Sequence, residues 1–228
     1  MLLPNKRLHL TPRQGLGVGH FVRLGCSVRS NQKRFQNSSR FAAQVSREPL
    51  GATQPIMGIA MDAPVDRAGT LTRFQAGIAA LEEAVVGLGD DALDAVPSGG
   101  GWTVRQIVHH LADGDDIWKL AIKMAIGHDD AVFDLGWYQV MPQQEWADRW
   151  VYVSRPIHAS LSLLKASREN VLQLLEHTPD AWHRAVLLRK PDGQMERIPV
   201  GFIVGMQAEH VFHHLKRIQE ILNQGRGT

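Results

Sequence analysis

The sequence predicts an all-α protein, a four-helix bundle with a long crossover loop and a small β-hairpin before the last helix. Three observations support this fold class. Apolar residues recur at helical spacing in four separate stretches. One connection between these stretches, residues 127–159, is much longer than the others, as in bundles that contain a crossover. Two short β-capable runs precede the final stretch.

The first helix is predicted over Leu71–Gly87. Thr70 stands where an N-cap is expected, and the Gly-Leu-Gly segment at residues 87–89 predicts the end of the helix. Residues 90–95 are predicted to add one short turn. The apolar positions of the first helix form a single stripe: Leu71, Phe74, Ile78, Leu81 and Val85.

The second helix begins at Trp102-Thr103 and is predicted to run to about Ile126. Thr103 and Gln106 have the spacing of a capping box, in which each side chain bonds the backbone N–H of the other residue. The third helix is predicted over Ser160–His177. Between the two lies the crossover, Gly127–Ala159, and long ordered loops of this kind are usually functional. It is rich in aromatic residues: Trp137, Tyr138, Trp146, Trp150 and Tyr152.

The last helix is predicted from about Val200 to Gln224, with Gly225 at its end. The runs Ala185–Leu188 and Met195–Val200 flank a Pro-Asp-Gly segment before it. Such a segment between two β-capable runs predicts a hairpin.

The charge of the chain is unevenly distributed. Residues 1–47 hold nine basic and no acidic residues, so the other 181 residues hold 16 basic against 23 acidic ones. The high isoelectric point therefore belongs to the N-terminal segment, and it does not indicate that the acidic body binds nucleic acid.

Residues 1–60 show no sustained hydrophobic period and predict a disordered basic extension, whereas residues 61–228 form the folded domain. Two interpretations of the extension stay open. In the first, translation starts at Met57 or Met61, and the upstream stretch is a gene-prediction artefact. In the second, the extension is a real basic arm that contacts nucleic acid or acidic lipid.

Cys26 is the single cysteine, which excludes a disulfide framework within the monomer and favours a cytoplasmic location. No apolar run approaches the roughly 20 residues that a membrane-spanning helix requires, so no membrane partner is expected.

Two histidines of the last helix, His210 and His214, are four residues apart and project from the same side. That face is otherwise apolar, since it continues through Ile203, Met206, Ile218 and Ile221. The competing pair at the same spacing, Glu209 and His213, shares its face with Gly205, Lys216 and Glu220, which is typical of a solvated surface. His210 and His214 are therefore predicted to point into the bundle.

The second helix offers a similar choice between His109 and His110. The face of His110 continues through Ile107, Gly114 and Ile117, and the face of His109 through Arg105, Asp113 and Asp116. We therefore expect His110 to point inward and His109 to face solvent.

Three inward imidazoles predict a metal site at His110, His210 and His214. One buried histidine alone is more often a core residue bonded to a neighbour. Three buried histidines each need a buried partner for a polar ring nitrogen, and one divalent ion can be the partner of all three. Three nitrogen ligands with an open position are typical of catalytic zinc, while nickel and iron also suit these ligands.

The segment Gly101-Trp-Thr-Val-Arg-Gln-Ile-Val-His-His-Leu-Ala-Asp113 resembles the second-helix signature of the DinB superfamily, in the branch that includes YfiT and is related to bacillithiol transferases. Glu145-Trp-Ala, Ser160–Leu164 and His210-x-x-His-His214 extend the resemblance over residues 66–224. It implies a four-helix bundle, often a homodimer, with zinc or nickel on the three histidines already singled out.

The resemblance also implies an enzyme in which the metal activates a low-molecular-weight thiol for S-transfer to an electrophilic small-molecule substrate. The alternative is a hydrolase that activates water, and the second alternative is a metal-binding bundle without catalysis. The sequence departs from the family pattern at Arg168, Phe212 and Glu209. These differences leave the three metal ligands intact, but they leave the substrate unassigned. No catalytic residue is assigned.

Overall fold

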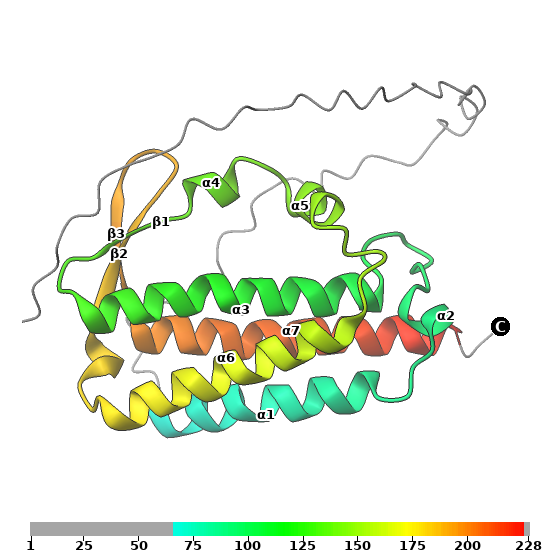
Figure 1. Ribbon diagram of the computed structural model, residues 1–228, viewed down its shortest axis with the longest axis horizontal. Helices are drawn as coiled ribbons and strands as arrows, with labels where there is room; N and C mark the ends of the chain where they lie inside the picture. The colour runs from blue at the N-terminus through cyan, green and yellow to red at the C-terminus, as the bar shows by residue number, and fades with distance from the viewer. Residues whose placement is uncertain (1–65, 226–228) are drawn as a thin grey trace, which may run out of the picture. The chain divides into compact units, whose positions relative to one another are not determined.

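The computed structural model describes residues 66–225, and its main feature is a bundle of four long helices (Figure 1). These are α1 (Arg67–Val85), α3 (Val104–Gly127), α6 (Ile157–His177) and α7 (Val200–Gly225). The predicted fold class is confirmed. The prediction of a disordered extension at residues 1–60 lies outside the described residues.

Short elements fill the connections between the long helices. They are α2 (Asp90–Leu93), β1 (Val132–Asp134), α4 (Gly136–Gln139), α5 (Gln143–Arg149), the 3₁₀ helix η1 (Ala181–His183), β2 (Ala185–Arg189) and β3 (Met195–Pro199). Three of them, β1, α4 and α5, belong to the crossover, which passes over α3 on the side away from α1 (Figure 1). Within residues 66–225, no helix combines the length and the apolar composition that crossing a membrane requires.

Helix α1 begins one turn earlier than the sequence predicted. Asp66 is its N-cap, and the carboxylate accepts hydrogen bonds from the backbone N–H groups of Ala68 and Gly69 at 3.1 Å each. The assignment of the cap to Thr70 is therefore wrong, because an aspartate in front of a helix satisfies free N–H groups at least as well as a threonine. The predicted apolar stripe is confirmed: Phe74, Ile78, Leu81 and Val85 are buried, and Leu71 is half-buried against the core cluster that includes Phe74.

Helix α3 has the predicted capping box. The Thr103 hydroxyl accepts from the backbone N–H of Gln106 at 3.3 Å, and the Gln106 side chain accepts from the backbone N–H of Thr103 at 3.0 Å. This cap fixes where α3 starts, and so fixes the position of His110 two turns further on.

The predicted hairpin is confirmed as β2 and β3, which pair antiparallel with Val186 opposite Ile198. The sheet also has a third strand that the sequence did not predict. Strand β1 of the crossover pairs parallel with β2, with Val132 opposite Leu187, in the order β1-β2-β3. The start of the crossover is thereby tied to the segment that leads into α7.

Candidate metal centre

The structure brings the three predicted histidines together between α3 and α7. The Nε2 atoms of His110 and His210 are 3.0 Å apart, and those of His214 and His210 are 3.1 Å apart. One ligand atom from each of the three residues lies within 4.8 Å of the other two. Among the described residues, this is the one group of three or more histidine, cysteine or acidic side chains with such spacing.

Hydrogen bonding alone satisfies this cluster poorly. Each ring nitrogen has a single in-plane position, occupied by a proton or by a lone pair. The Nε2 of His210 therefore cannot form a good hydrogen bond with both of its neighbours. The Nδ1 of His214 is also buried without a hydrogen-bond partner among the described residues.

The spacing of the three nitrogens fits a shared cation. Nitrogens that bind one tetrahedral ion at the usual zinc–nitrogen distance lie about 3.3 Å from each other. The two Nε2–Nε2 distances, 3.0 and 3.1 Å, are close to that separation. His110, His210 and His214 could therefore hold a divalent ion without a large movement of either helix.

The three imidazoles are held in the neutral form that metal binding requires. Burial lowers the pKa of His110 well below its usual value, and the neighbouring His210 and His214 lower it further. Burial likewise lowers the pKa of His210 to about 4 and that of His214 to about 3. At neutral pH each ring keeps a lone pair free for a cation.

One wall of the centre is aromatic, and a glycine lies beside another part of it. The Trp102 ring meets the His110 ring edge-on, with 4.7 Å between centroids, and the Trp102 Nε1–H donates to the Gln144 Oε1 of α5 at 2.6 Å. Gly114 lies one turn after His110, where a Cβ atom would be 3.9 Å from the Cε1 of His210. The small residue leaves space beside the cluster.

The prediction that His109 faces solvent is wrong. Its side chain is fully buried, with Nδ1 2.7 Å from the Ser160 Oγ and Nε2 3.0 Å from the carbonyl oxygen of Arg155. A carbonyl only accepts, so Nε2 donates and Nδ1 accepts from the serine hydroxyl. His109 thus binds the end of the crossover to α3.

The polar face around His109 has the same role. The Arg105 side chain is 7 % exposed and donates to Asp94 and to the Arg155 carbonyl oxygen. The Tyr152 hydroxyl donates to the Asp113 carboxylate at 2.6 Å. Periodicity marked this face as solvated because its residues are polar. Arg105 and Asp113 instead find partners in the crossover, and Arg105 also pairs with Asp94, which precedes α3.

The last helix follows the prediction on both faces. His213 is exposed. Glu209 lies at the surface and forms an ion pair with Arg73 of α1. Hence the neighbours of the two α7 histidines do not enter the cluster.

Sequence reasoning missed a buried ion pair next to the centre. Arg168 of α6 is fully buried, and its Nε donates to the Asp115 carboxylate of α3 at 2.6 Å. The sequence does contain a signal for this ion pair, because Arg168 continues the inward stripe of Leu164, Val171 and Leu175. A charged residue on a buried stripe predicts a buried partner.

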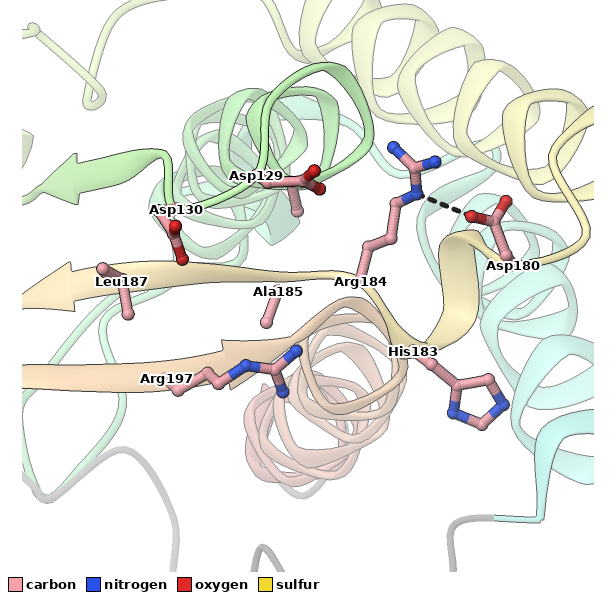
Figure 2. Close-up of a pocket in the computed structure, with 9 residues that line it drawn as sticks. Asp129, Asp130, Asp180, His183, Arg184, Ala185, Leu187 and Arg197 are labelled. Atoms are coloured by element: carbon pink, nitrogen blue, oxygen red, sulfur yellow. Dashed lines mark hydrogen bonds and ion pairs between the residues drawn. The ribbon is translucent and has the colours of Figure 1, made fainter.

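A separate cavity of about 300 Å³ lies where the end of α3 meets the sheet (Figure 2). None of the three clustered histidines lines it. Arg184 pairs with Asp180 at its edge (Figure 2). The same guanidinium donates to the carbonyl oxygen of Ile126 at 2.6 Å. The histidine cluster therefore lies apart from this cavity.

Comparison with known proteins agrees with this geometry. A DinB superfamily profile matches residues 73–218. A protein of Oceanobacillus iheyensis is 32 % identical over 142 residues, covering 62 % of this chain and 77 % of the relative. YfiT of Bacillus subtilis is 27 % identical over 143 residues, covering 63 % of this chain and 76 % of YfiT. Both relatives bear the provisional name of metal-dependent hydrolase.

The solved structure of YfiT has an unusual four-helix bundle topology and is similar to this one. The TM-score is 0.59 at 25 % identity, over 69 % of this chain and 86 % of that one. The profile match extends from the first helix to the last and includes all three clustered histidines. The chain belongs to the DinB superfamily.

Proposed function

We propose that the protein is a metal-dependent enzyme and that His110, His210 and His214 hold its divalent ion. Zinc is the first candidate for this ion. The observation that carries the proposal is the convergence of three neutral imidazoles, with Nε2 atoms 3.0 and 3.1 Å apart. The family membership and the names of the relatives support it. Nickel and iron are the other ions that this ligand set suits.

A cation on three neutral nitrogens supplies Lewis acidity, which lowers the pKa of a thiol or a water molecule bound beside them. The residues of the chain prepare this site. His210 and His214 are partly exposed as residues, and Gly114 carries no side chain beside the Cε1 of His210, which leaves a route by which a small molecule would approach. This partial exposure favours an enzyme over a closed structural metal site.

For the reaction, we propose transfer of a low-molecular-weight thiol to an electrophilic substrate, as the second-helix signature implies. Hydrolysis is the second candidate, and the names of the relatives favour it. The two reactions differ in the nucleophile that ends in the product. An electrophile is incubated with enzyme in ¹⁸O-water, with and without a thiol. A thioether product supports transfer, and ¹⁸O in the product supports hydrolysis.

The metal ligands are tested by substitution. His110→Ala, His210→Ala and His214→Ala should each remove most of the bound metal, because two imidazoles hold zinc far more weakly than three. His213→Ala is the matched control, since His213 is exposed on the same helix and should leave about one ion per chain. Metal content is measured by plasma mass spectrometry. Full metal retention in His214→Ala would falsify the ligand set.

Two further predictions accompany the proposal. A homodimer is what the family resemblance implies, and sedimentation of the purified protein tests it. A cytoplasmic location follows from the single cysteine and stays a prediction.

A further inference from the structure

The layer directly beneath the metal centre is polar, although it lies in the middle of the bundle. Its central residue is Arg168 of α6, which is fully buried. Its guanidinium donates to the Asp115 carboxylate at 2.6 Å, to the carbonyl oxygen of Phe74 at 2.8 Å and to that of Gln207 at 2.8 Å. One side chain thus joins α6 to α3, α1 and α7.

This layer holds together the two helices that carry the histidines. Asp115 follows His110 on α3 by five residues, and Gln207 precedes His210 on α7 by three, so both lie about one turn from a ligand. The Gln207 Nε2 also donates to the backbone carbonyl oxygen of Asp115 at 3.3 Å. The helices are therefore bridged directly by an amide and indirectly by the guanidinium.

The packing around the guanidinium leaves little freedom. The Phe74 ring lies under it, with 4.3 Å from the guanidinium carbon to the ring centroid. Gly77 of α1 is needed for the close approach, because a Cβ atom there would be 3.0 Å from the Arg168 Nη1 and 3.2 Å from a methyl carbon of Val211. Val211 adjoins His210, so the arginine, α1 and the ligand-bearing helix share one tight contact.

We propose that Arg168 is a positioning residue of the metal centre. It sets the separation and register of α3 and α7 so that the nitrogens of His110, His210 and His214 converge. A fixed guanidinium suits this role because its planar fork binds three helices at defined angles. An apolar residue would fill the volume without fixing the register. This inference rests on the proposed metal site.

A purely structural role predicts a different outcome from a positioning role. Replacing a buried ion pair by apolar residues of similar volume often preserves stability. If Arg168 serves stability alone, the double variant Arg168→Met/Asp115→Leu should fold and bind metal as the wild type does. If Arg168 positions the ligands, this variant should fold but bind zinc about 10- to 100-fold more weakly, as when groups that support metal ligands are removed.

The test measures zinc affinity by chelator competition, and the visible spectrum of the cobalt-substituted protein reports ligand geometry. Arg168→Lys, which keeps the charge and loses the fork, should also weaken zinc binding and change the cobalt spectrum. Gly77→Ala should do the same, since it displaces the guanidinium without removing it. Leu175→Ala is the control: it removes a buried side chain of α6 two turns away and should lower stability with little effect on zinc affinity.

All variants are compared at a temperature where circular dichroism shows them to be folded. Zinc affinity within threefold of the wild type in both Arg168→Lys and the double variant, with unchanged cobalt spectra, overturns the positioning role alone. A wild-type protein that binds no stoichiometric metal overturns the proposed function and this inference together.

Discussion

Protons and metal ions compete for the same nitrogens in the histidine cluster. Burial lowers the pKa of His210 to about 4 and of His214 to about 3, whereas a histidine in an unfolded chain has a pKa of about 6.5. Between these values the unfolded chain binds more protons than the folded protein. The stability of the metal-free protein therefore rises with pH in this window.

Metal-free protein should accordingly lose stability as the pH falls from about 6.5 towards 4. Melting temperatures are measured in chelator from pH 7 to pH 4. His210→Gln and His214→Gln should flatten the curve, because each removes one group that the unfolded state protonates first. Equal pH dependence in wild type and both variants would show that other groups cause the loss.

The identity of the clustered residues was predictable from sequence because each lies on a stripe that is otherwise apolar. Face continuity separates His210 and His214 from Glu209 and His213 for this reason. The same rule failed at His109, which is buried because its hydrogen-bond partners, Ser160 and the carbonyl of Arg155, come from a distant segment of the chain. It also passed over Arg168, since charged residues are ordinarily solvated and their partners here come from other helices.

At the scale of elements, the four long helices follow from periodicity and capping, whereas β1 does not. A strand of three residues carries too little alternation to be recognised, and its partner β2 lies about 50 residues away. The crossover is held at β2 by this pairing and at α3 by His109, Arg105 and Asp113. The crossover is therefore held in place against the bundle at these points.

His109→Ala should therefore destabilise the protein by about 2–5 kcal/mol, since it leaves the Ser160 hydroxyl and the Arg155 carbonyl without their partner and opens a cavity. Urea denaturation measures the free energy of unfolding. His213 is exposed, so His213→Ala should change the free energy of unfolding by less than about 0.5 kcal/mol. Equal stabilities of the two variants would mean that His109 does not anchor the crossover.

At the scale of the whole molecule, the folded body is expected to be independent of the N-terminal extension. A chain that begins at Met61 retains Asp66, the N-cap of α1. It should keep the metal content and the melting temperature of the full chain, because the removed stretch has no hydrophobic period with which to pack. A drop of several degrees in melting temperature would show that the extension contributes to the body.

The hydrogen bonds of Arg168 also bear on how the bundle comes apart. Its acceptors include a carbonyl of α1 and one of α7, the first and the last of the four bundle helices. Detachment of either terminal helix would leave a buried guanidinium short of an acceptor, which costs more than the bond itself contributes to the native state. Partly unfolded forms are thereby disfavoured, and in urea the loss of helical circular dichroism should coincide with the change in tryptophan fluorescence as one transition.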